Sequence, residues 1–202
     1  GDEAVLRKGW DIVRRNQDKI SSLVMDMLSF SKEREPEPVP SDLNELITEI
    51  VETVRQRAAE TQAVIHWEPA ADLPRLLFDP EGLSRAILNV VTNALDAVEG
   101  RPHAAVTISV AADREAGLVR VRVADNGAGM TPETLADIFN LFASTKGARG
   151  TGLGLTVSRK ILREHGGEIH ASSRIGEGST FLLEFPLRPA LDAPADPAGV
   201  RP

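Results

Sequence analysis

The segment LNVVTNALDAV, residues 88–98, carries three polar residues at the spacing of a single helical face. Asn89, Asn93 and Asp96 would lie together on a helix, while the apolar residues between them face the core. A carboxamide near a triphosphate can offer its oxygen to Mg²⁺, a cation that prefers oxygen ligands. The alternative is that these polar residues only decorate an exposed helix face.

The segment DNGAGM, residues 125–130, directly follows the alternating stretch LVRVRVA. Asp125, at the end of an expected strand, could accept a hydrogen bond from an exocyclic amine such as that of adenine. Gly127 and Gly129 allow the backbone to approach a flat ring closely. An ordinary turn is the alternative, because Asp-Asn-Gly is also favourable turn chemistry.

The segment TKGARGTGLGL, residues 145–155, combines glycines with two cations, Lys146 and Arg149. Its backbone N–H groups can converge on an anion, and the helix expected from about Gly152 directs its positive end there. It is not a Walker P-loop, because no lysine and hydroxyl residue follow Gly152. It is also a poor dinucleotide fingerprint, because no strand leads into it. A flexible linker would not explain why an amphipathic helix starts at once.

The segment GEGSTFLLEFPL, residues 176–187, reads as a tight turn followed by a core strand. We expect it to place Thr180 where its hydroxyl could support a buried carboxylate. A purely structural turn and strand is the alternative.

Taken in order, these segments resemble the sequence boxes of sensor histidine kinases. LNVVTNALDAV resembles the N box, DNGAGM the G1 box, IFNLFASTK the F box and GTGLGL the G2 box. The resemblance covers about residues 41–188. Within the family, the arrangement of the F and G2 segments is most similar to that of the nitrogen-regulation and oxygen-sensing branch. It implies an α+β, Bergerat-type two-layer sandwich: a mixed sheet with helices on one face and an ATP lid between the second and third segments.

The resemblance also implies roles for individual residues. Asp125 would bind the adenine amine, Asn93 would coordinate Mg²⁺, and Phe139 and Phe142 would anchor the lid. Lys146 and the backbone of residues 150–154 would hold the phosphates of ATP. The expected nucleotide-contacting residues are Asn89, Asn93, Asp96, Asp125, Gly127, Gly129, Lys146, Gly150, Thr151, Gly152, Leu153, Gly154 and Thr180.

Asn89 separates this chain from the gyrase, chaperone and mismatch-repair ATPases, which share the fold implied by the resemblance. Those enzymes place a glutamate one helical turn before the metal-binding asparagine to activate water. Asn89 occupies that position here, and a carboxamide cannot act as a general base. We therefore expect a kinase that keeps the phosphoryl group for a protein acceptor.

The elements that must position these residues can be read from apolar periodicity. Ser41 is the expected cap of a first helix, and the glycine-rich stretch 127–151 reads as a long loop. Further helices are expected over 80–99 and 153–164, with a short one near 132–138. Strands are expected over 63–69, 106–112, 118–124, 167–173 and 179–187.

The domain organisation follows from the proline-rich segment EREPEPVP, residues 33–40, which excludes a continuous helix. We expect a long helix over residues 1–34, a linker over 35–40, an ATP-binding catalytic domain over 41–188 and a disordered tail over 189–202. The resemblance makes the long helix part of a dimerisation and phosphotransfer hairpin. It implies two partners: a response regulator receiver domain and a second kinase protomer. The second protomer would pair through the N-terminal helix, and truncation would weaken that pairing.

None of the four histidines fits the acceptor position of such a kinase: His66, His103, His165 and His170. The start at Gly1 and the beginning inside a hairpin favour a fragment whose acceptor histidine lies elsewhere. The alternatives are a protein-serine kinase of the anti-sigma-factor class, which phosphorylates another chain, and a non-catalytic nucleotide-binding scaffold.

Composition excludes or disfavours several kinds of site and partner. The chain has 202 residues, a formal net charge of −7 and no cysteine, so disulfides and thiolate metal sites are excluded. No apolar run approaches the roughly 18 residues of a membrane span, and scattered basic residues disfavour nucleic acid as a partner. We expect a cytoplasmic protein without membrane contact in this region.

Overall fold

The computed structural model describes residues 35–141 and 152–190, together with Leu6, Gly9, Trp10, Val13 and Gln17. Those five residues have helical backbone and are exposed. The rest of the helix predicted over 1–34, and residues 191–202 of the predicted tail, lie outside the described residues.

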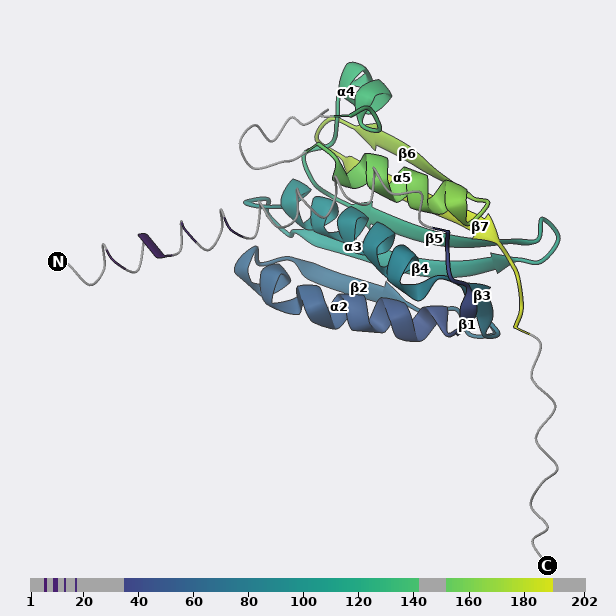
Figure 1. Ribbon diagram of the computed structural model, residues 1–202. Coiled ribbons are helices and arrows are strands. Elements are labelled where there is room, and N and C mark those ends of the chain that lie inside the picture. Colours follow the sequence, from purple (N-terminus) through teal and green to yellow (C-terminus); the bar gives the residue numbers. More distant parts are fainter. Residues whose placement is uncertain are drawn as a thin grey trace, which may run out of the picture.

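A mixed five-stranded sheet forms one layer of the molecule (Figure 1). In spatial order its strands are β2 (Val64–Glu68), β4 (Ala105–Asp113), β5 (Leu118–Asp125), β7 (Gly178–Pro186) and β6 (Glu168–Arg174). Strands β2 and β4 are parallel, and every other neighbouring pair is antiparallel. All five were predicted from the sequence to within two residues at each end.

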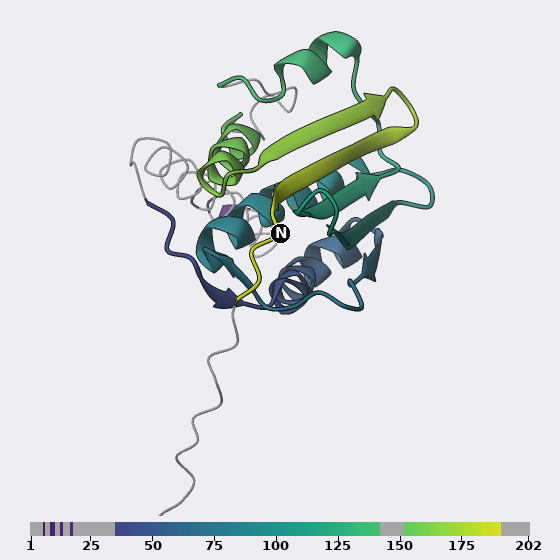
Figure 2. The same ribbon diagram turned by 90° about the vertical axis from the view of Figure 1, so that its right-hand side faces the viewer.

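Three helices form the second layer. These are α2 (Leu43–Glu60), α3 (Pro80–Ala97) and α5 (Gly154–Glu164). They lie side by side against one face of the sheet, and a short helix, α4 (Pro132–Asp137), stands at its β6 end (Figures 1 and 2). The arrangement is the predicted α+β sandwich with a mixed sheet and helices on one face.

The core lies between the two layers. In β5 every second residue, Val119, Val121 and Val123, is fully buried, as the alternating pattern requires for one covered face. The central helix α3 buries a wide apolar stripe against this face, and its members are Leu83, Ala86, Ile87, Val90, Val91, Ala94 and Leu95. Burial of this kind is the main stabilising contribution, at roughly 25 cal/mol per Å² of apolar surface.

Two features differ from the predictions. The cap of α2 is Asp42, whose carboxylate accepts a 3.1 Å hydrogen bond from the Glu45 N–H. Ser41, the predicted cap, instead ends the short strand β1 (Val39–Ser41). That strand pairs antiparallel with β3 (Leu76–Phe78), and neither strand was predicted. Three residues are too few to show a period of two.

Candidate functional site

Asp125 is a buried carboxylate at the last position of β5, with 9% of its surface exposed. Its Oδ1 accepts hydrogen bonds of 2.8 Å from the Gly127 N–H and 3.2 Å from the Ser179 N–H. Burying an ionised group is costly unless such partners accompany it. The carboxylate is therefore fixed in orientation by two backbone groups before any ligand arrives.

The loop after Asp125 is held so closely that it needs glycine at two positions. A Cβ on Gly127 would lie 2.5 Å from the Ala97 carbonyl oxygen, at the end of α3. Gly129 has φ +67°, and a Cβ there would lie 1.9 Å from the Arg174 carbonyl oxygen. The sequence predicted that these glycines let the backbone approach a flat ring, which stays a prediction. The close neighbours in the structure are α3 and the β6–β7 turn. We call residues 126–130 the base loop.

Thr180 does not support Asp125 as predicted. It pairs across the sheet with Ala124, and its hydroxyl accepts a 3.4 Å hydrogen bond from Arg122. The neighbour of Asp125 in the strand register is Ser179. Side chains alternate between the two faces of a strand, so a difference of one residue moves the hydroxyl to the opposite face.

Two serines that the sequence analysis missed lie behind the base loop. The Ser173 hydroxyl accepts a 2.9 Å hydrogen bond from the Met130 N–H and lies 3.0 Å from the Ser179 hydroxyl. They face each other across β6 and β7. Only the register of this strand pair reveals them, because each is an ordinary serine in its own strand.

The three polar residues of α3 do not converge on one point. The Asn89 side-chain amide donates to the Gly154 carbonyl at 3.2 Å and to the Ser158 hydroxyl at 3.4 Å, which ties α3 to the first turn of α5. Asp96 forms an ion pair with Arg57 of α2. Asn93, half-buried, lies on α3 between these two attachments, so its role as a metal ligand stays a prediction.

The beginning of α5 has the form expected of an anion site. Its N-cap residue is the buried Leu153, whose apolar side chain makes no cap hydrogen bond to the first turn. Gly152, directly before it, has φ +67°. The backbone N–H groups of a first turn and the helix dipole together favour an anion. The predicted phosphate contacts Lys146, Gly150 and Thr151, like Phe142, lie outside the described residues.

Phe139, predicted to anchor the lid, is attached to α5 in two ways. Its carbonyl oxygen accepts a 3.1 Å hydrogen bond from the Thr156 hydroxyl. The guanidinium of Arg159 stacks over its ring at 5.1 Å from the ring centre, an arrangement that attracts a cation to an aromatic face. A pocket of about 530 Å³ opens beside Phe139, lined by Thr156, Arg159, Lys160, Arg163 and Glu164. The base loop contributes no lining residue to it.

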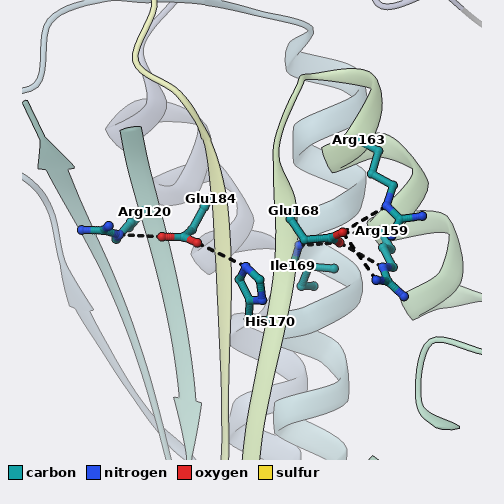
Figure 3. A network of polar contacts seen from close by, with 7 residues as sticks. All are labelled: Arg120, Arg159, Arg163, Glu168, Ile169, His170 and Glu184. Atoms are coloured by element: carbon teal, nitrogen blue, oxygen red, sulfur yellow. Dashed lines mark hydrogen bonds and ion pairs between the residues drawn. The ribbon is translucent and has the colours of Figure 1, made fainter. Parts of the chain in front are cut away.

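Glu168, at the start of β6, holds Arg159 in that position. Figure 3 shows Arg159 and Arg163 of α5 both directed at its carboxylate, at 2.9 Å each. Partial burial alone would raise the pKa of Glu168, but hydrogen bonds from Arg159, from the Ile169 N–H and from Arg163 outweigh it and lower that pKa to about 2. The carboxylate is therefore ionised at neutral pH.

The chain belongs to a known family of nucleotide-binding domains. Residues 78–189 match the family described as histidine kinase-, DNA gyrase B-, and HSP90-like ATPase. The matched segment runs from the end of β3 to just beyond β7, so it contains α3, the base loop and α5. No helix of the described part of the chain is both long and apolar enough to cross a membrane.

Individual relatives narrow the class further. The chain is 37% identical over 178 residues to the sensor histidine kinase ZraS of Klebsiella oxytoca, which covers 87% of this chain and 37% of that protein. Full-length ShkA in complex with AMPPNP superposes with a TM-score of 0.79 at 31% identity, covering 91% of this chain and 39% of ShkA. The histidine kinase ThkA in complex with the response regulator TrrA superposes with a TM-score of 0.71 at 28% identity, covering 88% of this chain and 50% of that chain.

Proposed function

We propose that this chain is the ATP-binding catalytic region of a two-component sensor protein-histidine kinase. It transfers the γ-phosphoryl group of ATP to a histidine other than the four in this sequence. The observation that carries the proposal is the pre-oriented carboxylate of Asp125 beside the base loop, on a chain whose curated relatives are sensor histidine kinases. The chain spans 37% of the first of those relatives, so it supplies only part of such a protein.

Base recognition follows from the geometry of Asp125. One oxygen of the carboxylate is occupied by two backbone N–H groups, which orients the group towards a donor such as the adenine amine. Gly127 has no Cβ to collide with the Ala97 carbonyl, so its backbone can lie close enough to donate to Asp125. A nucleotide with a carbonyl in place of the amine would face a negative acceptor and bind more weakly.

The phosphates would lie at the beginning of α5, a placement supported by the positive end of the helix dipole directly after Gly152. Mg²⁺ bound with ATP would be held by the Asn93 oxygen and would neutralise charge on the phosphates. The chain's own residues contribute positioning: Asn89 holds the first turn of α5 against α3 through Gly154 and Ser158. Positioning and charge neutralisation are the main sources of catalysis in phosphoryl transfer.

Asn89 also favours a kinase over a hydrolase. Its side-chain N–H groups are engaged with α5, and a carboxamide cannot take a proton from water. Slow attack by water preserves the phosphoryl group for a protein acceptor.

The histidines of this chain have other roles. His165 is hydrogen-bonded at both ring nitrogens: Nδ1 lies 2.8 Å from the Ile161 carbonyl oxygen, and Nε2 accepts from the Asp79 N–H at 3.1 Å. His170 pairs with Glu184 across the outer face of the sheet (Figure 3). The remaining two lie on β2 and in the loop before β4: His66 and His103. We propose that the acceptor belongs to a helical hairpin, in a dimer with a second protomer.

The partners of the whole protein follow from this proposal. A response regulator receiver domain would take the phosphoryl group from the acceptor histidine, and both reactions would take place in the cytoplasm. The related histidine kinase ThkA forms a complex with the response regulator TrrA, which supports this choice of partner.

A calorimetric titration tests the proposal. We expect the chain to bind ADP and a non-hydrolysable ATP analogue at one site, with Mg²⁺ changing the affinity for the analogue. An absence of binding with and without Mg²⁺ would contradict the proposal and favour a non-catalytic scaffold.

A further inference from the structure

Arg101 joins the base loop to a turn that is distant in the sequence. It lies in the connection between α3 and β4. Its Nη2 atom donates a 3.0 Å hydrogen bond to the Gly127 carbonyl and a 2.7 Å hydrogen bond to the Gly176 carbonyl. One guanidinium nitrogen carries two hydrogens, so it can serve both acceptors. Hydrogen bonds from a charged donor are stronger than neutral ones.

The position of Arg101 is set by the end of α3. Its N–H donates to the Val98 carbonyl at 3.0 Å, and the intervening Gly100 has φ +73°, a conformation that favours glycine. The last residue of α3, Ala97, accepts a 3.0 Å hydrogen bond from the Ala128 N–H. The helix end therefore contacts the base loop twice, through its own backbone and through Arg101.

Gly127 is the residue through which Arg101 can influence the site. Its N–H donates to Asp125, and its carbonyl accepts from Arg101. Rotation of this residue would change both bonds together. Arg101 holds the 127–128 peptide, which adjoins the 126–127 peptide whose N–H orients the Asp125 carboxylate. It therefore acts on that carboxylate through the Gly127 backbone.

The loop keeps other attachments when the guanidinium is removed. The Gly176 N–H donates a 2.8 Å hydrogen bond to the Ala128 carbonyl, and the Met130 N–H donates to Ser173. These bonds hold the far side of the base loop, whereas Arg101 holds Gly127. Loss of Arg101 should therefore displace the peptide next to Asp125 without unfolding the domain.

We propose that Arg101 is a positioning residue for recognition of the adenine base. It fixes Gly127, and through Gly127 the direction in which Asp125 accepts the exocyclic amine. The inference rests on the proposed function, because it requires that Asp125 reads the base.

The test compares two nucleotides that differ at the group Asp125 would read. ADP carries the amine and IDP carries a carbonyl at the same ring position. We expect Arg101→Met, which keeps an unbranched apolar side chain but removes every donor, to weaken ADP binding roughly tenfold and IDP binding much less. Arg101→Lys, which restores a charged donor, should recover part of the preference for ADP.

Arg114→Met is the matched control. Arg114 also donates to a backbone carbonyl, that of Asp72 at 3.1 Å. It lies in the β4–β5 turn, at the opposite end of β5 from Asp125. This variant should bind both nucleotides as the parent chain does.

The outcomes separate the inference from the proposed function. Parent-like ADP binding and an unchanged ADP-to-IDP ratio in Arg101→Met would overturn the inference and leave the proposed function intact. An equal loss for both nucleotides would also overturn it, because that is the effect of a general structural weakening. A parent chain that binds neither nucleotide would overturn both.

Amide hydrogen exchange of the nucleotide-free chain provides a second test of the attachment through Arg101. Without Arg101 the Gly176 carbonyl loses its donor, and the adjoining Gly176 N–H bond to Ala128 should open more often. We expect exchange of that amide to accelerate roughly tenfold in Arg101→Met and to stay unchanged in Arg114→Met. Equal exchange in all three proteins would count against the attachment through Arg101.

Discussion

At the scale of single residues, burial and backbone hydrogen bonds distinguish the side chains of the candidate site from others of the same type. Asp125 is one of many acidic residues in the sequence, but it is buried and bonded to two backbone N–H groups. The sequence singled out Asp125, Gly127 and Gly129 because a carboxylate at a strand end is followed by two glycines, and their contact with a nucleotide stays a prediction. It expected the Thr180 hydroxyl to support the carboxylate, whereas the supporting group from β7 is the Ser179 backbone N–H, because strand register is a long-range property.

Asp125→Asn separates base recognition from folding. The amide oxygen of asparagine can still accept from Gly127 and Ser179, so the melting temperature should change little. Loss of the negative charge should weaken ADP binding by roughly ten- to a hundredfold. Calorimetry and thermal denaturation of the same samples give both quantities. Asp113→Asn, at the last residue of β4, is the control, and equal ADP affinity in both variants would remove Asp125 from the base site.

Gly129→Ala tests how closely the base loop approaches the β6–β7 turn. Alanine would suffer both the positive φ of +67° and a Cβ 1.9 Å from the Arg174 carbonyl oxygen. Gly117→Ala is a matched control, because Gly117 has φ +66° and no atom within 4 Å of a Cβ. We expect the control to lose about 1 kcal/mol of unfolding free energy and Gly129→Ala to lose about 3 kcal/mol. Urea denaturation measures both, and equal losses would contradict the close approach.

At the scale of elements, helix periodicity and strand alternation predicted the main helices and strands, and the family resemblance supplied their arrangement in two layers. The apolar stripe of α3 and the alternation of β5 each identify the element and its buried face. Periodicity could not predict β1 and β3, which have three residues each. It also could not predict which elements become neighbours. Arg101 and Arg159 therefore had no distinctive signal in the sequence, although each joins separate segments of the fold.

The attachment of α5 to β6 should weaken in acid. Glu168 has its pKa lowered from the ordinary value of 4.5 to about 2, so its ion pairs stabilise the fold fully above pH 4.5. That contribution is lost as the pH falls from about 4.5 towards 2, when the carboxylate becomes protonated in the folded state. Because the ion pairs of Glu168 are partly exposed to solvent, their contribution to the free energy of unfolding is reduced.

Glu168→Gln provides the corresponding measurement. The difference in urea midpoint between the parent chain and Glu168→Gln should be larger at pH 6 than at pH 3. Glu177→Gln is the control, because Glu177 is exposed and lies 3.7 Å from its partner Arg174. A difference that is the same at both pH values would mean that the attachment does not depend on the Glu168 charge.

At the scale of the whole molecule, the site lies where the ends of three elements meet. The C-terminal ends of β5 and α3 border the base loop, and α3 is tied to the beginning of α5 through Asn89. Under the proposed function, the phosphoryl group passes from this position to an acceptor outside the sandwich. His165 is engaged at both ring nitrogens within it.

We therefore expect that this chain alone, given Mg²⁺ and ATP labelled at the γ-phosphate, gains no stable label. Addition of a separate helical hairpin carrying the acceptor histidine of a related kinase should place label on that hairpin. Phosphohistidine is labile in acid whereas phosphoserine is stable, so acid treatment before electrophoresis distinguishes the two products. Acid-stable label on a protein substrate would favour the protein-serine kinase alternative. Acid-labile label on this chain itself would mean that one of its four histidines accepts the group, which would contradict the proposal that the acceptor lies elsewhere.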